Sequence, residues 1–190
     1  MVKLNLGCGP SIFPTYINID LSNSKADMID DMVTLTKIET GTVDLIYSSH
    51  SVEHLEHHVL LKALKRWYEV LKEKGTLIVR CPNGEVWCRE WLQTSDTKRY
   101  GTSLQNAILG LPDSNMRHRN IISKGMLKRY IEEVGFEIVT LTETGRRSKE
   151  LVEILSKGGE DEGINFTNGC CDLYCKATKK FVGSPCKLFL

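Results

Sequence analysis

The sequence predicts a single α/β domain with a mostly parallel, seven-stranded sheet flanked by helices. Short apolar runs alternate along the 190 residues with longer segments of helical periodicity. Several of the short runs are continuously apolar, which is typical of strands that are covered on both faces. The length fits one domain, and no linker rich in Pro, Gly or Ser divides it. We therefore treat residues 1–190 as one domain.

Seven short runs are expected to form the strands: residues 3–6, 17–21, 26–29, 43–48, 76–81, 136–141 and 171–177. The clearest helix is expected over residues 56–72, where apolar side chains recur every three or four residues, and Gly75 is expected to end it. A second helix is expected between Ser123, which can cap its N-terminus, and Gly135.

Two connections depart from this regular alternation. Only residues 7–16 separate the first two strands, so the helix that would connect them is expected to be reduced or absent. This would leave part of one sheet face under-covered, and a second subunit or a neighbouring domain of a longer polypeptide could cover it. Residues 82–122 show weak periodicity and are expected to form short helices and loops. An insertion at this place can form a lid or a wall of a substrate pocket.

The composition excludes several classes of function. Lys and Arg number 25 and Asp and Glu 24, and a net charge of +1 is too small to attract nucleic acid to the whole surface. No apolar stretch approaches the roughly 18 residues of a membrane-spanning helix, and the N-terminus does not resemble a signal peptide. The odd count of 7 cysteines without paired CxxC spacing indicates reduced thiols. We expect a cytoplasmic protein with no nucleic-acid partner and no membrane span.

The most informative motif is a strand that runs directly into a glycine turn. The strand ending at Leu6 is followed by Gly7 and Gly9, and glycines at such a turn let a ligand approach the backbone closely. The second strand ends in a carboxylate, Asp20, and an acid at that place in a nucleotide-binding α/β fold accepts hydrogen bonds from ribose hydroxyls. Turn and acid together indicate a nucleoside ligand. A purely structural turn is the alternative, because the spacing is not GxGxxG.

The order of the motifs resembles the class I S-adenosylmethionine-dependent methyltransferases. Besides the glycine turn and Asp20, the resemblance is carried by the strand 43–50, by the E-H-L segment that follows it, and by the L-K-x-x-G-x-L pattern that begins near Lys72. It is good over residues 4–82 and looser over residues 127–137. The resemblance implies a Rossmann-like fold and S-adenosylmethionine as the cofactor, with S-adenosylhomocysteine as its product.

The resemblance also implies which residues contact the cofactor. These are residues of the glycine turn, of the ends of the second and fourth strands, and of the segment after the third strand: Gly7, Cys8, Gly9, Pro10, Asp20, Leu21, Asp31, Met32, Ser48 and Ser49. Asp31 is expected to contact the adenine, with Asp30 as the rival assignment.

A hydroxyl acceptor needs a general base, and the sequence offers three candidates. His50 lies at the carboxyl end of the fourth strand, where ligands bind in open α/β sheets. His118 stands in the insertion expected over the site, and imidazole titrates near neutral pH. Asp113 could act as the base or orient a histidine. Glu53 and His54 are expected instead to fix the start of the following helix.

A metal ion is not expected at this site. His50, Glu53 and His54 invite a metal interpretation, but their order is not HExxH, so a divalent cation remains only an alternative.

The favoured acceptor is a hydroxyl of a sugar or glycan, methylated with a histidine as general base. This choice follows from a resemblance of the S-H-x-x-E-H segment to small methyltransferases of glycan and sugar pathways. Trp87, Trp91 and Tyr100 could offer faces for a sugar ring, or could be core residues. The alternatives are methylation of another small metabolite, with a carboxylate, phenol or amine acceptor, and a cofactor-binding module without catalysis.

Overall fold

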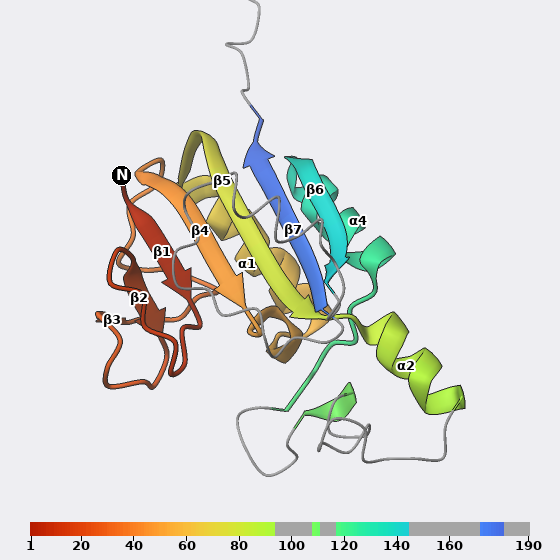
Figure 1. The fold of residues 1–190 in the computed structure, drawn as a ribbon. Coiled ribbons are helices and arrows are strands. Elements are labelled where there is room, and N and C mark those ends of the chain that lie inside the picture. The colour runs from red at the N-terminus through yellow and green to blue at the C-terminus, as the bar shows by residue number, and fades with distance from the viewer. Residues whose placement is uncertain (94–107, 111–116, 145–171, 181–190) are drawn as a thin grey trace, which may run out of the picture.

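The computed structural model describes residues 1–93, 108–110, 117–144 and 172–180. A seven-stranded sheet of order β3-β2-β1-β4-β5-β7-β6 forms the centre (Figure 1). Its strands are β1 (Lys3–Leu6), β2 (Ile17–Asp20), β3 (Met28–Ile29), β4 (Val43–Ser49), β5 (Leu71–Pro82), β6 (Phe136–Thr144) and β7 (Asp172–Lys179). Each strand expected from the sequence overlaps one of these strands.

The sheet is mostly parallel, as expected from the sequence, but it is mixed, because β7 runs antiparallel to the other strands. Strands β1 to β5 pair in parallel with their neighbours, whereas β7 runs antiparallel to both β5 and β6 and lies between them. The sequence could not show this, because an apolar strand has the same two-residue period in either direction. The last strand along the chain therefore occupies an internal place in the sheet.

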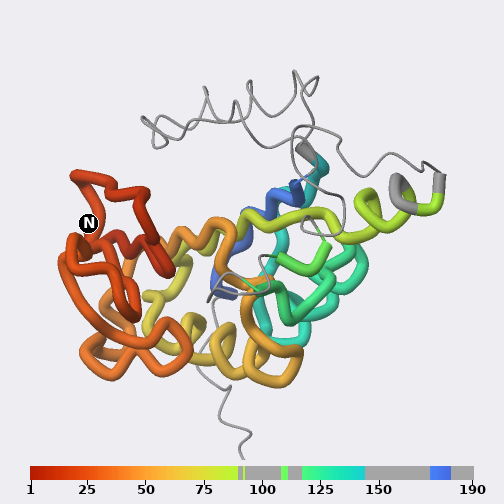
Figure 2. Tube along the Cα trace, turned by 90° about the horizontal axis from the view of Figure 1, so that it is seen from below, coloured from red at the N-terminus to blue at the C-terminus, as the bar shows by residue number. Residues whose placement is uncertain are grey.

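Two amphipathic helices cover one face of the sheet (Figure 2). They are α1 (His57–Val70) and α4 (Lys124–Val134), and the apolar stripes predicted from the sequence face the core. Trp67 of α1 is fully buried, and its indole Nε1–H donates to the carbonyl of Met32 at 2.7 Å. The hydroxyl of Ser123 accepts the N–H of Met126 at 3.3 Å, as expected of an N-cap.

Helix α1 ends at Val70, five residues before Gly75, which was expected to end it. Leu71 is fully buried and pairs with Val43 in the sheet, so its burial as a strand residue ends the helix first. The next pair joins Leu45 to Thr76, and the intervening residues form an irregularity in β5.

The opposite face is covered by aromatic side chains where a helix was expected to be reduced. Residues 7–16, all of which the structure describes, contain no helix, which confirms that expectation. Phe13 and Tyr16 pack there against the buried Tyr47, and the ring centroids of Phe13 and Tyr47 are 5.6 Å apart. Helices α1 and α4 thus both lie on the other face of the sheet.

The insertion after β5 begins with helix α2 (Gly84–Gln93), which extends away from the end of the sheet (Figure 1). Tyr100 and Asp113 lie outside the described residues, and so does the side chain of Trp91. No helix in the described part of the chain is both long and apolar enough to cross a membrane.

Candidate active site

Three of the predicted site residues lie at the carboxyl edge of the parallel strands. Gly7, Asp20 and His50 stand at the ends of β1, β2 and β4, which are neighbours in the sheet. Ligands bind at this edge in open α/β sheets, where the order of the strands reverses on either side of the first strand. The fold therefore brings the glycine turn, the strand-end acid and the histidine to one edge.

The glycine turn combines a packed position with an open one. Gly7 and Gly9 have φ angles of 63° and 49°, in the left-handed region that favours glycine. A Cβ on Gly7 would lie 2.7 Å from the Cβ of Ser51 and 3.3 Å from the Sδ of Met32, whereas a Cβ on Gly9 would meet no atom within 4 Å. Gly7 is thus required for packing, and Gly9 faces space that a ligand can occupy.

Asp20 is held by backbone donors. Its Oδ2 accepts the N–H of Gly9 at 2.9 Å, and its Oδ1 accepts the N–H groups of Ser22 and Asn23 at 3.0 Å. Burial would raise the pKa of Asp20, but these hydrogen bonds outweigh it and hold the pKa below the ordinary value. A carboxylate can accept about four hydrogen bonds, so this one retains capacity for a ligand hydroxyl.

Asp30 and Asp31 differ in how much of each carboxylate remains available. Both oxygens of Asp30 bind its own loop, accepting from Asp31 and Thr36 at one oxygen and from Lys37 at the other. Asp31 is half-buried, and its Oδ1 accepts the N–H of Val33 at 2.8 Å. The geometry favours Asp31 over Asp30 as a ligand-facing acid.

The remaining predicted cofactor residues differ in how far they are buried. Ser48 is fully buried and its hydroxyl is hydrogen-bonded to that of Ser51, so it supports the turn after β4. Cys8 is buried, and burial chiefly raises the pKa of its thiol. Pro10 and Leu21 are exposed, and Ser49 is half-buried.

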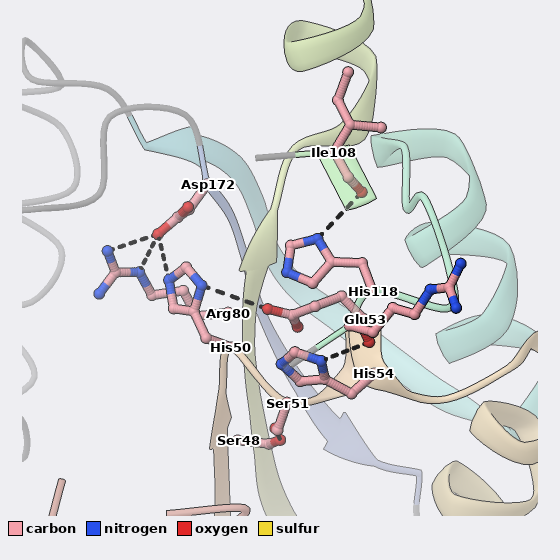
Figure 3. A network of polar contacts seen from close by, with 10 residues as sticks. Ser48, His50, Ser51, Glu53, His54, Arg80, Ile108, His118 and Asp172 are labelled. Carbon is pink, nitrogen blue, oxygen red and sulfur yellow. Dashed lines mark hydrogen bonds and ion pairs between the residues drawn. The ribbon is translucent and has the colours of Figure 1, made fainter. Parts of the chain in front are cut away.

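His50 lies between two carboxylates (Figure 3). Its Nε2 is 3.0 Å from the Oδ2 of Asp172, its Nδ1 is 3.5 Å from the Oε1 of Glu53, and 45% of its side chain is exposed. Burial would lower the pKa of His50, but the two carboxylates raise it to about 9. The imidazole is therefore protonated at neutral pH, with both nitrogens facing carboxylates, and is poorly suited to accept a proton.

Arg80 and Asp172 complete this cluster, and the sequence analysis missed both. The Nε and Nη2 of Arg80 lie 2.7 and 2.6 Å from the Oδ2 of Asp172, and both side chains are buried. They are 92 residues apart in the chain. The only available signal was a charged residue inside an apolar strand, since Arg80 interrupts the run from Leu77 to Cys81.

His118 is placed to accept a proton. Its Nδ1–H donates to the carbonyl of Ile108 at 3.3 Å, which leaves Nε2 as the unprotonated nitrogen of the neutral ring. Burial chiefly lowers the pKa of His118, so the ring is neutral near pH 7. Its ring contacts that of His54, with the centroids 5.2 Å apart.

Glu53 lies between His50 and His118 (Figure 3). Its side chain is 3% exposed, and its Oε2 has no hydrogen-bond partner among the described residues. Its backbone carbonyl accepts the N–H groups of Arg119 and Asn120, at 2.8 and 3.1 Å. Glu53 thus joins the 3-10 helix η1 (Val52–His54) to the segment that carries His118, and its carboxylate is not used as a helix cap.

Glu53, His54 and His118 are the described residues that could hold a metal ion. Their ligand atoms lie within 4.8 Å of one another, and two imidazoles with one carboxylate suit Zn²⁺. With bonds of about 2.0–2.1 Å, a tetrahedral ion would hold its donors about 3.4 Å apart, which lies within that limit. The sequence analysis had considered His50 here in place of His118.

A pocket lies beside this cluster, and most of its wall comes from the insertion. It is lined by Glu53 together with Pro82, Gly84, Trp87, Ile108, His118 and residues 120–122. The amide Nδ2 of Asn120 is buried and has no partner among the described residues. The pocket combines an aromatic side chain, a neutral imidazole, a buried carboxylate and a buried amide, of which the sequence analysis missed Asn120.

Comparison with known proteins identifies one family and several solved structures with a similar fold. A family model described as a methyltransferase domain matches residues 4–141. A comparison with curated proteins finds no match. At the identities below, the likeness to solved structures shows the fold alone.

An S-adenosylmethionine-dependent methyltransferase from Archaeoglobus fulgidus is 17% identical, with a TM-score of 0.56 over 93% of this chain and 85% of that one. One from Methanosarcina mazei is 13% identical, with a TM-score of 0.60 over 94% and 92%. The 1,6-didemethyltoxoflavin N1-methyltransferase of Burkholderia thailandensis, solved with its substrate and S-adenosylhomocysteine, is 12% identical, with a TM-score of 0.59 over 94% and 71%.

Proposed function

The chain belongs to the family of methyltransferase domains, and we propose that it transfers the methyl group of S-adenosylmethionine to a hydroxyl of a sugar or glycan. The observation that carries the proposal is His118, a neutral imidazole in a pocket beside the carboxyl edge of the sheet, whose Nε2 has no hydrogen-bond partner among the described residues.

The residues at the glycine turn fit this cofactor. The open space in front of Gly9 admits a ligand, and the ionised carboxylate of Asp20 has capacity for a ribose hydroxyl. Asp31 and Met32, together with Cys8, Pro10 and Leu21, would hold the adenosine. Ser48 and Ser49, at the end of β4, would support the turn that follows this strand. When bound, S-adenosylmethionine supplies a methyl group on a positively charged sulfur.

His118 is the general base of the proposed reaction. Its Nε2 takes the proton of the acceptor hydroxyl as the oxygen forms its bond to the methyl carbon and the bond from that carbon to sulfur breaks. His50 serves the site as a fixed cation that holds Asp172 and Glu53 in place. Asp113 lies outside the described residues and is a second candidate for orienting the acceptor.

The insertion over residues 82–122 forms the acceptor side of the site in this proposal. Trp87 offers an apolar surface to a sugar ring, and the other residues of the pocket wall come from the same insertion. The buried carboxylate of Glu53 would repel an acceptor carboxylate, which disfavours that alternative. A module without catalysis would have no use for a neutral histidine with an unprotonated nitrogen at this place.

The test compares His118→Gln with His58→Gln, which removes an exposed histidine from the first turn of α1. With labelled S-adenosylmethionine and a panel of p-nitrophenyl glycosides, we expect His118→Gln to lower turnover by about 10²–10⁴-fold, with the affinity for S-adenosylhomocysteine unchanged. His58→Gln should behave as the unmodified chain. Equal turnover of the two variants would overturn the role of His118, and no turnover of any glycoside by the unmodified chain would overturn the acceptor class.

The pH dependence gives a second readout. Because the pKa of His118 is lowered from 6.5, turnover should be constant above about pH 7 and fall as the pH drops below that lowered value. A rate that keeps rising through pH 9 would assign the base to another group.

A further inference from the structure

Two buried polar atoms in the acceptor pocket have no hydrogen-bond partner within the described part of the chain. They are the Oε2 of Glu53 and the Nδ2 of Asn120, and both residues line the same pocket. Glu53 is 2% exposed as a residue, so water at the surface does not solvate its carboxylate. Leaving a buried donor or acceptor unpaired is costly in a folded protein. Each atom therefore lacks a partner that a ligand group in this pocket could supply.

The chemistry of the two atoms defines that group. Oε2 can only accept a hydrogen bond while the carboxylate is ionised, and Nδ2 can only donate one. A hydroxyl satisfies both, because it donates to the carboxylate and accepts from the amide. A carboxylate ligand cannot donate and would be repelled by Glu53, and an ammonium group cannot accept from Asn120.

The distance to the base defines where this hydroxyl lies in the acceptor. A carboxylate oxygen of Glu53 and a ring nitrogen of His118 are within 4.8 Å of each other. Hydrogen bonds of about 2.8 Å from each atom reach two oxygens that are about 3 Å apart, which is the spacing in a vicinal diol. A diol therefore fits with one hydroxyl on His118 and its neighbour on Glu53.

We propose that Glu53 and Asn120 bind a second hydroxyl of the acceptor, adjacent to the one that is methylated, so that the enzyme selects vicinal diols. This inference rests on the proposed methylation of a sugar hydroxyl. The backbone holds the pair in place, because the carbonyl of Glu53 accepts the N–H of Asn120 at 3.1 Å. His50, facing the other oxygen of Glu53, leaves Oε2 directed to the ligand.

The test measures discrimination between a diol and its deoxy analogue. The best p-nitrophenyl glycoside of the panel is compared with the analogues that lack one hydroxyl next to the methylated position. The unmodified chain should prefer the diol by about 10–100-fold in kcat/KM, the effect of one hydrogen bond to a charged group. In Glu53→Gln and Asn120→Ala this preference should fall severalfold or more, through loss of the diol rate and not of the deoxy rate.

Glu56→Gln provides the matched control. Glu56 is a half-exposed carboxylate three residues away, and its removal should leave the preference unchanged. A substitution that only damaged the fold would lower the rates with the diol and with the deoxy analogue equally. The ratio of the two rates therefore separates binding of the hydroxyl from damage to the fold. Asn120→Ala keeps the test decisive if Glu53→Gln does not fold.

The outcomes distinguish this inference from the function on which it rests. Equal rates for the diol and all deoxy analogues, with glycosides still methylated, would overturn the role of Glu53 and Asn120 only. A preference that survives in both variants would overturn it as well. Failure to methylate any glycoside would overturn the proposed function, and this inference with it.

Discussion

The glycine turn and the acceptor pocket are built in opposite ways. The turn joins residues that lie close in the sequence, such as Gly9 and Asp20, and backbone N–H groups already satisfy much of the carboxylate. The pocket joins Glu53 to residues more than sixty positions later, and it leaves Oε2 of Glu53 and Nδ2 of Asn120 without partners in the described chain. The first region is complete as a folded structure. In our proposal, the second is complete only with a ligand.

This difference predicts where substitutions act. Changes at the turn should affect folding and cofactor binding, because its contacts are within the protein. Changes in the pocket should affect turnover and acceptor choice. Four experiments test whether substitutions in the two regions act differently.

The largest effect is expected for Gly7→Ala. The new Cβ would lie 2.7 Å from the Cβ of Ser51 at a φ of 63°, so it adds overpacking to left-handed strain. We expect the free energy of unfolding in urea to fall by about 3 kcal/mol, which combines about 1–2 kcal/mol of strain with about 1–3 kcal/mol of overpacking.

Gly41→Ala is the control for that measurement. Gly41 has a φ of 71°, but its Cβ would meet no atom within 4 Å, so it carries the strain without the clash. We expect Gly41→Ala to lower the free energy of unfolding by about 1 kcal/mol. Equal costs at both glycines would show that the space around Gly7 is not tightly packed.

The next effect is on cofactor binding. Asp20→Ala should weaken the affinity for S-adenosylhomocysteine at least about tenfold, because ribose hydroxyls would lose a partner in a partly buried site. Asp27→Ala, which removes a carboxylate whose hydrogen bonds in the described part of the chain go to Asn18, should leave that affinity unchanged in the same calorimetric titration. An unchanged affinity for Asp20→Ala would remove this acid from the cofactor site.

A smaller effect concerns the charge on His50. Its pKa rises from 6.5 to about 9 on folding, so the protonated ring stabilises the fold fully below about pH 6.5, and this contribution is lost as the pH rises through about 9. Since 45% of the side chain is exposed, solvent screening limits it to about 1 kcal/mol. His50→Gln should therefore be less stable than the unmodified chain at pH 6, and the two should converge by about pH 10.

Urea unfolding at the two pH values measures this difference. If the two proteins differ by the same free energy of unfolding at pH 6 and at pH 10, the imidazole carries no extra charge in the folded state.

The smallest effect is expected from removal of metal ions. In our proposal His118 uses its Nε2 on the acceptor, so EDTA followed by desalting should leave turnover unchanged. A loss that Zn²⁺ restores would instead assign Glu53, His54 and His118 to a metal ion and would withdraw the general-base role of His118.

The sequence predicts the first region well, for a physical reason. A strand, a glycine turn and a second strand that ends in an acid lie within about twenty residues, so spacing along the chain determines their arrangement in space. The missing helix of residues 7–16 followed from the same short distance. The helix that ends at Val70 was placed less well, because the burial of Leu71 outweighed the local signal of Gly75.

The second region could not be predicted, since it depends on pairings between distant segments. His50 meets Asp172 across 122 residues, and that contact follows from the position and direction of β7, which periodicity does not reveal. His118 was a candidate because of its residue type and its place in the insertion expected over the site. Its neutral state depends on burial and on the carbonyl of Ile108, neither of which a sequence pattern contains.

The internal position of β7 also sets the order in which the molecule can be completed during synthesis. A ribosome releases β5 and β6 before β7, although β7 lies between them in the finished sheet. Strand β6 can therefore take its final place only when Asp172–Lys179 has emerged and pairs with both strands. Arg80 and His50 receive the carboxylate of Asp172 from the same strand, so the charged cluster at the site cannot be completed before β7 is made.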